Sequence, residues 1–321
     1  MEKVCKWIDN IKDSDLCLRE VNPHYHNKDL QSYLSYYRFA TEKIDEYRCG
    51  LLKVNSKNLF IQFFLKDYSK ATIFLVHGYL DHSGGLSRTI NFLLENDYQV
   101  VVLDLPGHGF SEGEEGVISN FKDYLVAVEE GYRNIHEFIS VSLLYGFGHS
   151  TGGALLFHAA SENKIQLNGI ILVAPLFYPY RWNLIKGFLL FIGKYIPRKK
   201  RSFKKNSNDR VYRNFIKHDP LQVKVLQSAW VRAMNEWQAD FTDCPNLDHP
   251  VYFIQGTKDK TVDWQKNIAF YRNKCSKFQV ALFQRGRHQL LNERVEIREL
   301  VHRQVVSLLN SWSNASKEPK K

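Results

Sequence analysis

The sequence predicts an α/β protein in which helices cover a mostly parallel β-sheet. Between Tyr47 and Phe283, short β-branched or aromatic segments alternate with helical patterns, which is typical of this class. The chain has 321 residues, of which 44% are hydrophobic and 24% charged, so its composition is that of a folded protein and excludes a mainly disordered one. We expect one large core that carries an insertion.

The predicted sheet begins with a hairpin. Tyr47–Val54 and Leu59–Leu65 flank a polar turn at residues 55–58, so we expect two antiparallel strands at a sheet edge. Six mostly apolar segments follow, as expected for parallel strands that helices cover on both faces. They are Ala71–Val76, Gln99–Leu103, Ser142–Gly146, Gly169–Val173, Val251–Gln255 and Gln279–Phe283.

Five segments with apolar residues at helical spacing are the predicted covering helices. They are Leu86–Glu95, Phe121–Phe138, Gly153–Ser161, Trp264–Tyr271 and Arg294–Leu309. The alternation stops over residues 176–248, which we interpret as a cap inserted into a core of residues 45–175 and 249–312. Residues 1–44 form an N-terminal extension, partly helical around Leu30–Glu42, and residues 313–321 are expected to be a flexible tail.

Composition also limits cofactors and location. The five cysteines are scattered without a CxxC pair, so we expect neither a disulfide framework nor a zinc site, and no motif asks for another cofactor. The first fifteen residues lack the apolar core of a signal peptide, and the apolar stretch Phe188–Gly193 is too short to span a bilayer. We expect a cytoplasmic protein, and no feature of the sequence specifies its oligomeric state.

The segment Gly148-His149-Ser150-Thr151-Gly152 is the strongest chemical signal in the chain. It has the pattern G-x-S-x-G between a predicted strand and a predicted helix, which is typical of a nucleophile elbow. The glycines permit the sharp turn that exposes the serine hydroxyl above the sheet. Ser150 is therefore the candidate nucleophile.

A serine nucleophile needs a general base and a carboxylate that orients it. Asp259 follows the strand Val251–Gln255 at a glycine turn, and His288 follows the strand Gln279–Phe283, so the order Ser, Asp, His is present. We assign His288 as the base and Asp259 as the orienting carboxylate. Asp263 is the alternative carboxylate, and either aspartate could instead be a helix N-cap.

The transition state of acyl transfer places negative charge on the former carbonyl oxygen, which needs backbone N–H donors. Thr151, the residue after the nucleophile, is one predicted donor, and Tyr79, in the loop after Ala71–Val76, is the other. His77 and His82 lie in the same loop, and we interpret them as structural residues that position it.

These motifs in this order resemble the serine hydrolases of the α/β-hydrolase superfamily, and especially the monoacylglycerol lipase and lysophospholipase group. The matching segments are His77-Gly78-x-x-x-His82-Ser83-Gly84, residues 104–113, residues 148–153, Gly256-x-x-Asp259 and His288, which together span about residues 45–310. The resemblance implies an α/β-hydrolase fold and a carboxylester hydrolase for single-chain lipids, with a cap over the acyl pocket. Thr151 stands where this group commonly has Met.

The resemblance also implies a lipid ester, such as a monoacylglycerol or lysophospholipid, as substrate. A short-chain esterase or an aminopeptidase of the same fold is the alternative, and a binding protein without turnover is a third hypothesis. Fluorophosphonate labelling of Ser150 distinguishes an enzyme from such a binding protein.

The predicted cap carries an apolar stretch, residues 183–196, followed by a basic run, residues 198–205. Two interpretations stay open: peripheral contact with an anionic membrane, or a packed cap helix followed by a solvated loop. The net charge of +10 would also attract nucleic acid, but no nucleic-acid-binding motif accompanies the run, so we do not expect that partner.

Overall fold

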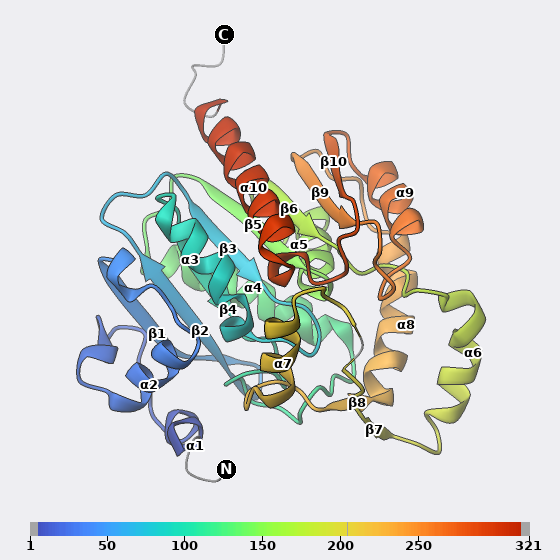
Figure 1. Ribbon diagram of the computed structural model, residues 1–321, viewed down its shortest axis with the longest axis horizontal. Coiled ribbons are helices and arrows are strands. Elements are labelled where there is room, and N and C mark those ends of the chain that lie inside the picture. Colours follow the sequence, from blue (N-terminus) through green and yellow to red (C-terminus); the bar gives the residue numbers. More distant parts are fainter. Residues whose placement is uncertain (1–5, 204, 316–321) are drawn as a thin grey trace.

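The computed structural model describes residues 6–203 and 205–315, and it confirms the predicted α/β fold (Figure 1). An eight-stranded sheet has the order β1-β2-β4-β3-β5-β6-β9-β10. The β1–β2 and β2–β4 pairs are antiparallel, and the remaining neighbours are parallel. The strands are β1 Glu46–Val54, β2 Lys57–Leu65, β3 Thr72–Val76, β4 Gln99–Leu103, β5 Leu144–His149, β6 Gly169–Val173, β9 Val251–Gly256 and β10 Phe278–Phe283.

Two apolar clusters pack on the two faces of this sheet. One contains the buried faces of α4 and α5 together with residues of α9, and the other contains those of α3 and α10. These helices are α3 Ser87–Glu95, α4 Phe121–Phe138, α5 Thr151–Ser161, α9 Trp264–Lys274 and α10 Val295–Ala315. Helices on both faces explain why the central strands β3, β4, β5 and β6 are buried along their whole length.

Two sequence predictions need correction. The strand expected at Ser142–Gly146 lies at Leu144–His149, because the chain pairs with β3 and β6 up to the residue before Ser150. The tail expected from residue 313 begins too early, because α10 continues to Ala315 and Ser313 is one of its buried residues. Residues 316–321, the rest of the predicted tail, lie outside the described residues.

The N-terminal extension is part of the core. It contains α1 Lys6–Lys12, α2 Lys28–Tyr36 and the 3-10 turns Pro23–Tyr25 and Thr41–Lys43. Tyr33 of α2 is fully buried, with its ring centroid 5.1 Å from that of Phe110 and its hydroxyl near Ser83. Figure 1 shows these helices in blue beside β1 and β2. The extension therefore covers one end of the sheet.

Residues 176–248 lie between β6 and β9 and are called the insertion below. It contains α6 Trp182–Ile192, β7 Arg198–Lys200, α7 Arg210–His218, β8 Val225–Gln227 and α8 Ser228–Thr242, and β7 pairs with β8 outside the main sheet. Helix α8 packs on the core, with the Trp237 ring stacked 4.8 Å from that of Phe121. Helix α6 lies at the edge of the molecule, far from the sheet (Figure 1), and Leu184 and Phe188 on it are 79% and 63% exposed.

None of the helices within the described residues is both long enough and apolar enough to cross a membrane.

Candidate active site

Ser150 sits in a strained turn between β5 and α5. Its φ of 51° is in the left-handed region that non-glycine residues rarely adopt. Its N–H donates to the Val173 carbonyl at 2.9 Å, which ties the turn to the neighbouring strand. A side chain on Gly152 would place its Cβ 2.2 Å from the carbonyl oxygen of Val76, and one on Gly148 would lie 2.4 Å from Gly153 Cα. Both glycines are therefore required by the turn.

The structure brings Ser150, His288 and Asp259 together. His288 Nε2 lies 3.1 Å from Ser150 Oγ, and His288 Nδ1 lies 2.8 Å from Asp259 Oδ2. The residues come from the carboxyl ends of β5, β9 and β10, which lie at one edge of the sheet. With Nδ1–H donating to the carboxylate, Nε2 is free to accept the serine proton.

Several hydrogen bonds hold the Asp259 carboxylate. Oδ1 accepts from the Thr261 N–H at 2.7 Å and from the Val262 N–H at 3.2 Å, and Oδ2 accepts from Gln255 Nε2 at 3.0 Å. Burial alone would raise the pKa of Asp259, but His288 and these donors hold it below its ordinary value. The group is therefore an anion at neutral pH.

Gln255 is a site residue that the sequence analysis missed. Its side chain is fully buried and donates to Asp259 from the end of β9. The sequence did contain a signal for it: Gln255 is a polar amide near the end of an apolar strand, four residues before Asp259.

Asp263, the alternative carboxylate, has a different role. It is the N-cap of α9, where Oδ1 accepts from the Lys266 N–H at 3.4 Å and Oδ2 lies 3.0 Å from Lys266 Nζ. These contacts face the helix. The structure therefore places Asp259 beside His288, whereas the Asp263 carboxylate bonds to Lys266 in the first turn of α9.

The two segments predicted to carry the oxyanion donors lie against each other. A Cβ on Gly78 would lie 3.0 Å from Ser150 Cβ, so the loop that contains Tyr79 passes directly beside the serine. Thr151 is the first residue of α5, where a backbone N–H has no carbonyl partner within its own helix. Residues 78–82 are called the oxyanion loop below.

Three further histidines support these loops. His77 Nε2 accepts from the Leu105 N–H at 2.9 Å, and His149 Nε2 lies 3.2 Å from the His288 carbonyl. Burial lowers the pKa of His77, and it lowers the pKa of His108 to about 4 and that of His149 to about 3. These rings are neutral at physiological pH and serve as hydrogen-bonding supports.

The insertion contacts the loop that passes beside Ser150, and the site is buried. Ser150 is 8% exposed and His288 is 5% exposed. Arg201, predicted as part of an exposed basic run, instead turns inward and donates through Nη1 to the carbonyls of Leu80 and Val223. Lys204, from the same run, lies outside the described residues. Arg198–Lys200 form the exposed basic strand β7, and Lys205 is also exposed.

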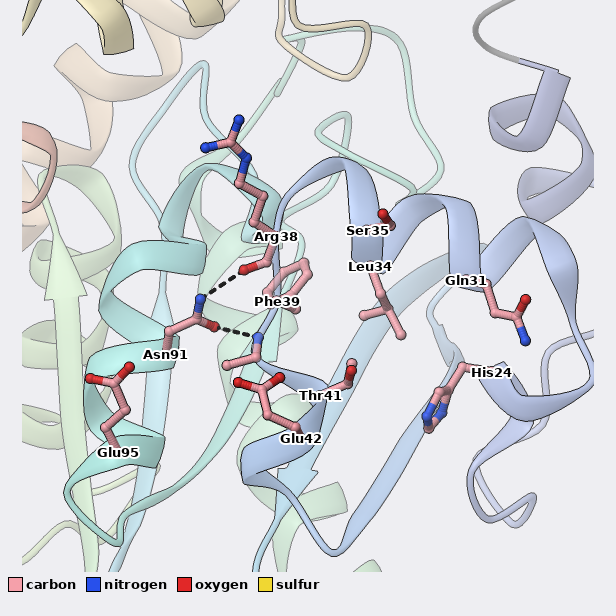
Figure 2. Close-up of a pocket in the computed structure, with 11 residues that line it drawn as sticks. His24, Gln31, Leu34, Ser35, Arg38, Phe39, Thr41, Glu42, Asn91 and Glu95 are labelled. Atoms are coloured by element: carbon pink, nitrogen blue, oxygen red, sulfur yellow. Dashed lines mark hydrogen bonds between the residues drawn. The ribbon is translucent and has the colours of Figure 1, made fainter.

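A surface hollow elsewhere holds none of these groups. Figure 2 shows it between the extension and α3, with a volume of about 550 Å³ and a lining that includes His24, Arg38 and Glu95. The Asn91 side chain bridges the extension to α3 there, through the Arg38 carbonyl and the Ala40 N–H. The hollow is a groove at a packing junction, and Ser150 is not among the residues that line it. Nowhere among the described residues do three or more His, Cys, Asp or Glu side chains gather as a metal site.

Comparison with known proteins gives a family match. A family described as serine aminopeptidase, S33, matches residues 67–295. Among curated relatives, the monoglyceride lipase of Rattus norvegicus is 25% identical over 251 residues, covering 76% of this chain and 82% of the relative. The monoglyceride lipase homolog of Monkeypox virus is 24% identical over 253 residues, covering 74% and 88%.

Solved structures share the fold. The crystal structure of Paleococcus ferrophilus monoacylglycerol lipase has a TM-score of 0.68 at 19% identity and covers 79% of this chain and 99% of its own. A soluble variant of the monoglyceride lipase from Saccharomyces cerevisiae, in complex with a substrate analog, also has a TM-score of 0.68 at 19% identity, covering 82% and 94%.

Proposed function

The chain belongs to the serine aminopeptidase S33 family of the α/β hydrolases, and on that basis we propose that it hydrolyses the carboxylic ester of a single-chain lipid, a monoacylglycerol or lysophospholipid. Ser150 is the nucleophile, His288 the general base and Asp259 the residue that orients the imidazole. The observation that carries this proposal is the pair of hydrogen bonds at His288, which accepts from Ser150 Oγ at 3.1 Å and donates to Asp259 Oδ2 at 2.8 Å.

Acylation begins when Ser150 Oγ attacks the ester carbonyl carbon while His288 Nε2 takes the hydroxyl proton. The carbonyl oxygen becomes an oxyanion, which the backbone N–H groups of Tyr79 and Thr151 stabilise. When the intermediate collapses, the ester C–O bond breaks and the imidazolium of His288 gives its proton to the leaving alcohol. Asp259 stabilises the imidazolium through Nδ1 without taking its proton.

Deacylation repeats the sequence with water. His288 removes a proton from a water molecule, whose oxygen attacks the acyl carbon and forms a second oxyanion in the same place. Collapse then breaks the bond to Ser150 Oγ, which recovers the proton from His288. The products are a fatty acid, the alcohol and the free enzyme, so atoms and charge balance without a cofactor.

We propose that the insertion, residues 176–248, is a cap that covers the acyl chain. The support is apolar packing: Trp237 and Phe241 of α8 are buried against the core, and the Phe241 ring lies 6.0 Å from that of Phe157 on α5. The names of the relatives, monoglyceride lipases, agree with a single-chain lipid. The buried Ser150 fits a reaction that is shielded from bulk water.

We further propose that α6 and β7 bring the cap to an anionic membrane. Phe188, Phe191 and Tyr195 are 63%, 60% and 72% exposed, and the cations Arg198, Lys199 and Lys200 follow them in the chain and are all exposed. An exposed apolar helix beside cations is complementary to a surface of lipid tails and phosphate headgroups.

A substrate panel tests the proposed function. Monoacylglycerols, lysophospholipids, short p-nitrophenyl esters and aminoacyl p-nitroanilides are compared, with Ser150→Ala as the control for background hydrolysis. We expect the highest kcat/KM for a long-chain monoester. Turnover confined to the anilides would establish the aminopeptidase that the family description names, and turnover confined to the short esters would establish a short-chain esterase.

A further inference from the structure

We propose that the cap holds the oxyanion loop in its active shape, so that Arg201, Gln222, Asp219 and Trp230 are positioning residues for the ester hydrolysis proposed above. This inference rests on that function. It assigns to the cap a part in the chemical step, beyond covering the substrate. Three sets of contacts, each to a different residue of the loop, support it.

The first contact is at Leu80, the residue after the predicted oxyanion donor Tyr79. Leu80 has a φ of 67°, a left-handed conformation that is unfavourable for a branched side chain. From the cap, its carbonyl accepts hydrogen bonds from Arg201 Nη1 at 3.1 Å and from Gln222 Nε2. From the core, His108 Nε2 accepts from its N–H at 3.1 Å. Hydrogen bonds from the cap and from the core therefore hold Leu80 in its strained conformation.

The second contact is a buried ion pair at the end of the loop. His82 Nε2 lies 3.0 Å from Asp219 Oδ2, and both side chains are fully shielded from solvent. The other oxygen of Asp219 accepts from the Tyr37 hydroxyl at 2.5 Å and from the Leu221 N–H at 3.0 Å. A buried charge without a partner costs free energy, so the pairing of His82 with Asp219 favours the position in which the cap contacts the loop.

The third contact is at the donor residue itself. The Tyr79 ring stacks on Trp230 of α8, with centroids 4.1 Å apart and planes inclined by 13°. The Tyr79 hydroxyl donates to the Gly116 carbonyl at 2.9 Å, so both ends of the side chain are fixed. The orientation of the Tyr79 backbone N–H is therefore fixed from two directions. The Tyr79 ring packs on Trp230 of the cap, and the next residue, Leu80, is hydrogen-bonded to the cap through its carbonyl.

This arrangement couples cap position to catalysis. If the cap moved away, Leu80 would lose two donors to its carbonyl and could relax from its strained conformation, which would turn the neighbouring donor away from the oxyanion. Since an oxyanion donor acts mainly in the transition state, the loss is expected in kcat rather than in substrate binding.

The test removes the donors to Leu80 without shortening the side chains greatly. Arg201→Met, Gln222→Met and the double variant are compared with wild type on the ester that wild type hydrolyses fastest. We expect the double variant to lose about 10- to 100-fold in kcat with KM changed by less than about twofold. A trifluoromethyl ketone, which forms an oxyanion with the active serine, should weaken by the same factor, whereas the ether analogue of the substrate should bind unchanged.

The matched control breaks another contact between cap and core. Arg88 on α3 pairs with Asp209 at the N-cap of α7 at 3.0 Å, a contact that involves no residue of the oxyanion loop, and Arg88→Met should leave kcat within about twofold of wild type. If the double variant fails to fold, the single variants decide by the same readouts. Unchanged kcat and ketone affinity with an active wild type would overturn the inference alone. A wild type that hydrolyses no ester would overturn the proposed function as well.

Discussion

Asp259 and Asp263 are four residues apart and differ in the groups that surround them. Asp259 is buried and accepts hydrogen bonds from His288, Gln255 and two backbone N–H groups. Asp263 caps α9 and pairs with Lys266. Two identical side chains therefore have different surroundings: Asp259 faces His288, and Asp263 caps a helix.

We predict that Asp259→Asn lowers kcat by about 10³- to 10⁴-fold, because the amide can no longer hold the His288 tautomer that accepts the serine proton. Asp263→Asn should lower it by less than about threefold, since an asparagine still caps a helix. Steady-state kinetics on one ester checks both variants. The reverse ranking would show that Asp263 is the orienting residue.

A second prediction concerns the way in which the three residues act together. Ser150→Ala and His288→Ala should each reduce kcat by about 10⁶-fold, and the double variant should be no worse than either, because members of one catalytic unit are not additive. Thermal unfolding checks that all three proteins fold. Additive losses would mean that the two side chains work in separate steps.

Individual site residues differed in how readily the sequence revealed them. Ser150, Asp259 and His288 were predictable because each follows a recognisable apolar strand in a fixed order. The Arg201–Leu80 and Asp219–His82 contacts join residues 121 and 137 positions apart, and no local pattern encodes such a pairing.

At the scale of elements, apolar segments predicted the bounds of strands and helices better than charged segments did. Gln99–Leu103, Gly169–Val173 and Phe121–Phe138 were predicted with their observed bounds, because each is a continuous apolar or strongly periodic segment. β7 was missed, since Arg-Lys-Lys has no apolar alternation and becomes a strand only by pairing with β8.

We predict that α6 and β7 together bind anionic bilayers. Changing Arg198, Lys199 and Lys200 to Gln should reduce sedimentation with phosphatidylserine vesicles by at least about tenfold, since each cation near such a surface contributes about 1 kcal/mol. Turnover of a dissolved short ester should not change. Co-sedimentation at two salt concentrations measures the effect, which added salt should weaken.

The control for this experiment changes the same number of charges elsewhere. Lys28, Lys43 and Lys53 are exposed on the extension and β1, on the opposite side of the molecule from α6 (Figure 1). Their replacement by Gln should leave vesicle binding close to that of wild type. Equal loss in both triple variants would indicate a general charge effect and contradict a role for α6 and β7.

At the scale of the whole molecule, Asp219 connects three parts of the chain. It bonds Tyr37 from the extension and His82 from the core, and it belongs to the insertion itself. Burial would lower the pKa of His82, but the carboxylates of Asp219, Asp104 and Asp81 raise it to about 9. Since this is above the unfolded value of about 6.5, His82 stabilises the fold most at low pH.

This raised pKa predicts a pH-dependent stability. The contribution of His82 is fully present below about pH 6.5 and is lost as the pH rises through about 9. The difference in unfolding free energy between wild type and His82→Gln should therefore fall by on the order of 3 kcal/mol between pH 6 and pH 10. Urea unfolding at both pH values measures it. A difference independent of pH would mean that His82 is neutral in the folded protein.

The most direct test of the proposed mechanism is to find the residue that an acyl-transfer probe modifies. The native protein is treated with a fluorophosphonate, and the adduct is located by peptide mass spectrometry in wild type and in His288→Ala. We predict a single adduct on Ser150, formed at least about 10³-fold more slowly without His288. An adduct on another residue, or an unmodified Ser150 in a protein that still hydrolyses the ester, would contradict the mechanism.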